Sequence, residues 1–114
     1  MTQLDDAIPE RVQERLEEAK FLGPDFGGTR AEIAQVYQVA TEAEEVKVLP
    51  LSHGGAHLVA YRDDWMDPQW AAMVPVLMEH VRPAGAKLRL VEAVRHEGET
   101  HTRELPNPNQ KEER

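Results

Sequence analysis

The residues with the greatest potential for chemistry lie in the segment SHGGAHLVAYRDD. His53 and His57 flank a glycine pair, and Asp63 and Asp64 follow in the same predicted hairpin. Two imidazoles and a carboxylate could bind zinc at ligand distances of about 2–2.3 Å. Neither an HExxH motif nor an HxxxH motif on a helix is present, so no cofactor is expected. A metal-dependent hydrolase using His53, His57 and Asp63 is the alternative interpretation.

Other reactive patterns are weak. Ser52 stands beside His53, but adjacent residues of a strand point to opposite faces, and no GxSxG motif surrounds this serine. The chain has no cysteine, which excludes disulfides and thiol nucleophiles. The glycines of GPDFGGTR follow a predicted helix rather than a strand, and they favour an inter-helix loop over a phosphate loop. We therefore expect no catalytic residues.

The charge balance excludes a typical nucleic-acid binder. Asp and Glu number 21 against 13 Lys and Arg, for a net charge of −8. Proteins that bind nucleic acid gain most of their affinity by neutralising phosphates with clustered Lys and Arg, and no such cluster is present. The acidity favours solubility and docking onto a basic protein surface.

Two predicted helices followed by a hairpin resemble the winged-helix family, and TRAEIAQV is similar to the second helix of a helix-turn-helix unit. The resemblance implies a nucleic-acid-binding regulator as a further alternative. That helix would carry Arg30 as its only base, whereas a helix that reads a DNA groove needs several donors. Nucleic acid is therefore an unlikely partner.

Periodicity and capping signals predict the element order. Residues 8–23 have helical spacing of apolar side chains, and Thr29 with Glu32 has capping-box spacing for a second helix ending near Thr41, with a strand as the competing interpretation. Strands around a Gly-Gly turn follow, the first an edge or bulged strand because of Pro50. A helix at 68–82, a strand at 86–96 and a weaker strand ending near Leu105 complete the order.

This order predicts an α+β fold: two N-terminal helices, a β-hairpin, a third helix, and one or two further strands. We expect a mostly antiparallel sheet with helices on one face, in a single domain over residues 1–105. Residues 106–114 have no apolar content and are expected to form a disordered tail.

Bulky apolar residues are most concentrated at Trp65, Met66, Trp70 and Met73. A partly exposed tryptophan beside adaptable methionines is typical of a docking or dimer surface, although both rings could instead close one end of the core. We predict a small acidic binding domain without catalytic activity, which engages a protein partner or a second copy through this surface or the sheet edge near Pro50. The acidic N-terminus and the absence of a long apolar run predict a cytoplasmic protein without membrane contact.

Overall fold

The computed structural model describes residues 8–19, 29–50, 55–81 and 87–105. The elements in chain order are α2 (Glu10–Ala19), α3 (Arg30–Thr41), β1 (Glu45–Pro50), β2 (Ala56–Arg62), α4 (Pro68–Glu79), β3 (Leu88–His96) and β4 (Glu99–Glu104). This order confirms the predicted α+β class, and the segment that could have been helix or strand is the helix α3. The glycine-pair turn with His53, and the C-terminal tail, lie outside the described residues.

The strands form one sheet in the order β1-β2-β3-β4. The β1–β2 and β3–β4 pairs are antiparallel hairpins, whereas β2 and β3 are parallel and are connected through α4. The sheet is therefore mixed and mostly antiparallel. Strand β1 lies at one edge, as Pro50 predicted, and β4 lies at the other.

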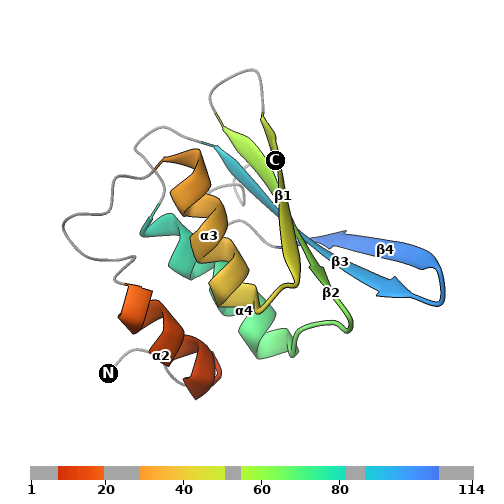
Figure 1. The fold of residues 1–114 in the computed structure, drawn as a ribbon, viewed down its shortest axis with the longest axis horizontal. Helices are drawn as coiled ribbons and strands as arrows, with labels where there is room; N and C mark the ends of the chain where they lie inside the picture. The colour runs from red at the N-terminus through yellow and green to blue at the C-terminus, as the bar shows by residue number, and fades with distance from the viewer. Residues whose placement is uncertain (1–7, 20–28, 51–54, 82–86, 106–114) are drawn as a thin grey trace, which may run out of the picture.

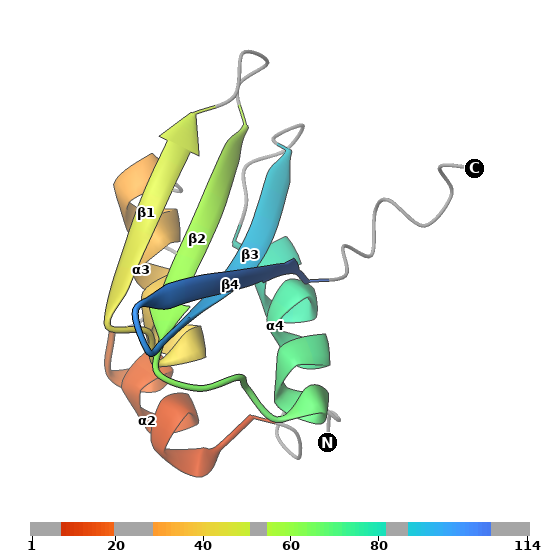
Figure 2. The ribbon, with the colours of Figure 1, turned by 90° about the vertical axis from the view of Figure 1, so that its right-hand side faces the viewer.

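The helices lie on one face of the sheet. Figure 1 shows the helical layer beside the sheet, and Figure 2 shows the sheet from its other face, with α3 and α4 behind it. We call the face without helices the open face. Because side chains alternate along a strand, Glu45, Lys47 and Leu49 of β1 belong to this face, whereas Val46 and Val48 face the helices.

Local signals set the helix ends. The Thr29 side chain accepts a hydrogen bond from the Glu32 backbone N–H, and the Glu32 side chain in turn accepts from the Thr29 backbone N–H, which completes the predicted capping box. Glu42 ends α3 in the left-handed conformation, with φ of 55°. Asp67 caps α4 by accepting from the Gln69 backbone N–H.

The core forms between the helices and the inner face of the sheet. The predicted stripe of α4 is buried, as are the inward-facing residues of the two central strands. These core residues are Val36, Tyr37, Leu58, Trp70, Val74, Leu77, Val81, Leu88 and Leu90. Helix α2 adds Ile8 and Val12 to this core, and Leu16 packs against it while half-buried.

An ion pair fixes α2 to the end of α3. The Arg11 guanidinium donates from Nε and Nη2 to the two carboxylate oxygens of Glu42, both at 2.7 Å. This hydrogen bonding from Arg11 lowers the pKa of Glu42 below its usual value. Because a carboxylate with a depressed pKa is stabilised by folding, the pair contributes stability above the unfolded-state pKa and loses it as the pH falls through the folded-state pKa.

We expect Glu42→Gln to lower the free energy of unfolding at neutral pH and to lose this effect under acidic conditions, where Glu42 is protonated in both states. Urea unfolding at pH 7 and at about pH 2 measures the difference; the second value lies well below the ordinary glutamate pKa of about 4.3 because the pKa of folded Glu42 is itself lowered. Glu17→Gln on the exposed side of α2 is the matched control. An equal destabilisation by Glu42→Gln at both pH values would contradict the ion-pair interpretation.

Candidate functional site

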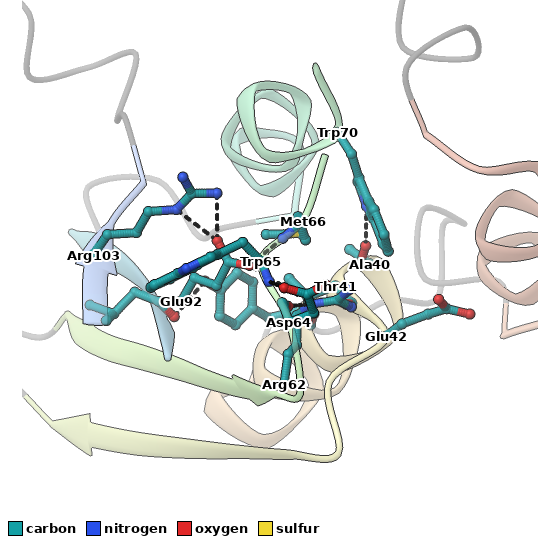
Figure 3. A network of polar contacts seen from close by, with 12 residues as sticks. Ala40, Thr41, Glu42, Arg62, Asp64, Trp65, Met66, Trp70, Glu92 and Arg103 are labelled. Atoms are coloured by element: carbon teal, nitrogen blue, oxygen red, sulfur yellow. Dashed lines mark hydrogen bonds and ion pairs between the residues drawn. The ribbon is translucent and has the colours of Figure 1, made fainter. Parts of the chain in front are cut away.

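The four predicted docking residues do not form one surface. Met66 and Trp70 are buried at 2% and 5% exposure, and Met73 is half-buried, whereas Trp65 is 38% exposed. The indole Nε1–H of Trp70 donates to the Ala40 carbonyl at 2.8 Å, which joins α4 to α3 (Figure 3). The structure therefore uses Met66 and Trp70 as core residues, and docking through Trp65 stays a prediction.

The structure also separates the predicted metal ligands that it describes. His57 lies near the start of β2, and Asp63 follows the end of the same strand. Six residues of extended chain at about 3.3 Å each place their backbones about 20 Å apart, too far to share an ion. No group of three or more potential metal ligands occurs within the described ranges, and His53 is outside them.

Sequence reasoning missed the most buried charge in the described chain. The Glu92 side chain of β3 has 0% exposure and faces the helical layer. Its Oε2 accepts from the Met66 backbone N–H at 2.6 Å, and its Oε1 accepts from Arg103 Nε of β4 at 2.8 Å (Figure 3). Arg62 Nε of β2 lies 3.8 Å from Oε2. We call Glu92, Arg62, Arg103 and the Met66 N–H the Glu92 cluster.

The cations of the Glu92 cluster extend it in two directions. Arg62 donates to the carbonyls of Thr41 and Asp64, and its guanidinium lies 4.8 Å from the ring centre of Trp70. The Arg103 guanidinium lies 4.8 Å from the ring centre of Trp65. The cluster thereby connects α3, the chain between β2 and α4, and the β3–β4 hairpin.

The contacts of Glu92 leave its carboxylate little capacity for catalysis. Both oxygens accept hydrogen bonds, and no described buried side-chain nitrogen or oxygen lacks a partner. Nearby, burial raises the pKa of the Tyr37 phenol, with the Glu92 charge adding to the effect, and Tyr37 donates to the Val91 carbonyl at 2.9 Å. A general base needs an accessible, correctly placed oxygen, so the geometry favours a structural role for the cluster.

A signal for Glu92 is present in the sequence. The inward-facing positions of β3 read Leu88, Leu90, Glu92 and Val94, so one carboxylate interrupts an apolar set. A charged residue at such a position requires paired partners because its burial alone is costly. The sequence does not show the pairing with Arg103, because that pairing depends on the register between β3 and β4.

Long charged side chains cover much of the open face. Arg95 of β3 crosses the Tyr61 ring of β2, 4.3 Å from its centre, and donates to Glu45 of β1 at 3.0 Å. The Lys47 ammonium lies 5.4 Å from the same ring centre. Val59 shares this face and is only 9% exposed, although none of the described helices lies on it.

Strand β1 leaves apolar side chains incompletely covered. Leu49 is 51% exposed and is, with Trp65, one of the two exposed large hydrophobic residues in the described ranges. Val46 and Val48 pack against the core but stay half-buried because β1 has no neighbour on its outer side in the described chain. We call β1, with these three side chains and its outer backbone groups, the β1 edge.

Comparisons with family models, curated proteins and solved structures found no match to this chain. None of the helices in the described ranges is both long and apolar enough to cross a membrane.

The different burial of the two tryptophans predicts different losses of stability when each is replaced by alanine. We expect Trp70→Ala to cost about 3–5 kcal/mol, because it empties a core site and removes the donor to Ala40. Trp65→Ala, its matched control, should cost less than about 1 kcal/mol, since it removes mainly an exposed contact with Arg103. Equilibrium urea unfolding of both variants measures the costs, and similar values would contradict the assignment of one ring to the core.

We expect Glu92→Ala to cost on the order of 3 kcal/mol, because it leaves the Met66 N–H without its acceptor and two guanidinium groups without their carboxylate. Glu104→Ala is the control: Glu104 pairs with Arg89 at 3.2 Å, but both side chains are exposed, so its loss should cost below about 1 kcal/mol. Urea unfolding distinguishes the two. A loss for Glu92→Ala as small as for Glu104→Ala would show that the cluster is not stabilising.

Proposed function

We propose that this domain is a non-catalytic protein-binding module that accepts an extended strand of another polypeptide along the β1 edge. The observation that carries the proposal is the outer side of a six-residue strand, where no strand of the described ranges pairs with it, with an exposed leucine and two half-buried valines. In strand addition, backbone hydrogen bonds supply affinity and alternate side chains supply specificity. The β1 edge offers both.

The opposite edge lacks this combination. Every residue of β4 is exposed, and its sequence ETHTRE has no large apolar side chain to bury against a partner. Charged residues on an edge strand are a common protection against unwanted pairing. The two edges of the sheet differ in composition, and only β1 gives a partner apolar surface on both faces.

The charges of β1 are compatible with pairing. Glu45 pairs with Arg95 of β3, and Lys47 extends over Tyr61 of β2 on the open face, so both long side chains lie over the sheet and away from its outer edge. A strand with Val or Leu at alternate positions could therefore approach β1 without separating an ion pair. Pro50 lacks an N–H, so at this end of the strand it offers a partner only its carbonyl oxygen.

Leu49→Lys should abolish partner binding through β1, because it replaces the exposed apolar contact with a solvated charge. The control is Thr102→Lys at the exposed β4 edge. Each variant and the wild-type chain would be immobilised and exposed to an extract of the native cells. A protein retained by wild type and Thr102→Lys but lost with Leu49→Lys supports the proposal, and hydrogen exchange must then show new protection in β1. Equal retention by all three chains contradicts it.

A further inference from the structure

We infer that the strand accepted by the β1 edge is β1 of a second copy, so that the protein forms a two-fold dimer in which two four-stranded sheets become one continuous sheet. This inference rests on the proposed function and names its partner. It follows from the self-complementarity of the sequence Glu45–Pro50 when the strand is paired with itself in antiparallel orientation.

Two-fold pairing allows few registers. Residues directly opposite each other in an antiparallel pair share a face. If one residue of β1 lies opposite the same residue of the second copy, both helical layers therefore lie on the same side of the sheet. We call this arrangement centring the pair on that residue. Centring on Val48 places Val48 opposite its symmetry mate, Lys47 opposite Leu49, and Val46 opposite Pro50. All of these residues belong to β1.

The other centred registers are less favourable. Centring on Lys47 would oppose two ammonium groups, and like charges directly opposite are destabilising. Centring on Val46 would require Ala43 and Glu44, which precede the strand and follow the left-handed end of α3. Centring on Leu49 would use only the last three residues of β1. The register centred on Val48 therefore pairs the most strand residues without opposing like charges.

This register also completes the burial that β1 lacks. On the helical side, Val46 and Val48 meet Val48 and Pro50 of the second copy, which extends the core across the new strand pair. On the open face, Leu49 lies beside Lys47 of the second copy, whose aliphatic stem can cover it while the ammonium stays in water. The half-buried valines and the exposed leucine thus acquire apolar neighbours.

The effect of salt on binding distinguishes a second copy from a basic protein as the partner. The chain carries −8, but β1 contributes one Glu and one Lys, so the contact itself is neutral. The remaining acidic residues of the two copies repel each other at long range, and salt screens that repulsion over a Debye length of about 8 Å at physiological ionic strength. The dimer should therefore tighten as salt is added, whereas docking onto a basic partner should weaken.

The chain has no cysteine, so single introduced thiols report the register directly. In the register centred on Val48, the two thiols of a Val48→Cys dimer lie on directly opposed residues, with Cα atoms about 4.5–5.5 Å apart, within the range of a disulfide. The two thiols of Leu49→Cys are offset by two residues along the strands, which places their Cα atoms about 8 Å apart, beyond disulfide reach.

The experiment combines light scattering of the wild-type chain with mild oxidation of the two cysteine variants. We expect a mass twice the 12.9 kDa of the chain, a dissociation constant that falls between 50 and 500 mM salt, and a disulfide dimer for Val48→Cys but not for Leu49→Cys. Leu49 is the more exposed residue, so random collision would give the opposite order. Leu49→Lys should be monomeric, and Thr102→Lys should remain dimeric.

A wild-type monomer up to millimolar concentration, or equal cross-linking of both cysteine variants, overturns the inference. If the chain is monomeric but retains a different protein in the Leu49-dependent capture, the proposed function stands and only the second copy is excluded. If a dimer forms that Leu49→Lys does not disrupt, and Val48→Cys does not cross-link, the contact lies elsewhere and the inference is overturned.

Discussion

The burial of one carboxylate is the constraint on which the rest of the structure depends. Glu92 lies on a central strand beneath the helical layer, where an unpaired charge would be strongly destabilising. Its compensation requires Arg103 from β4, Arg62 from β2 and the Met66 backbone N–H from the chain before α4. Because these groups come from separate elements, the cluster fixes the β3–β4 hairpin and the entry to α4 relative to the sheet.

Charged side chains are also paired on the open face, but the edge strand β1 keeps apolar side chains uncovered. Arg95 and Lys47 lie over the Tyr61 ring, and Arg95 also pairs with Glu45 across β2. These side chains cannot satisfy the outer backbone groups of an edge strand. Strand β4 meets water with polar and charged side chains, but β1 presents Val46, Val48 and Leu49. This asymmetry is the physical basis of the proposed binding role.

Much of the fold could be predicted because its signals are local. Thr29 with Glu32, and Asp67 with Pro68, mark helix starts through contacts within one turn, and both are observed. Apolar spacing identified the buried residues of α3 and α4, and Pro50 identified an edge strand. The candidate site was less predictable: Trp65, Met66, Trp70 and Met73 are close in sequence, but the change from loop to helix directs Met66 and Trp70 inward and leaves Trp65 exposed.

The sequence by itself determined the element order, the helix caps, the acidic charge and the absence of thiol chemistry, because each depends on residue type or on short-range spacing. Only the tertiary structure decided that His57 and Asp63 lie at opposite ends of β2 and that Glu92 meets Arg103. It also decided which edge of the sheet keeps apolar side chains uncovered. These facts depend on strand register and on the packing of distant segments, which local patterns do not encode.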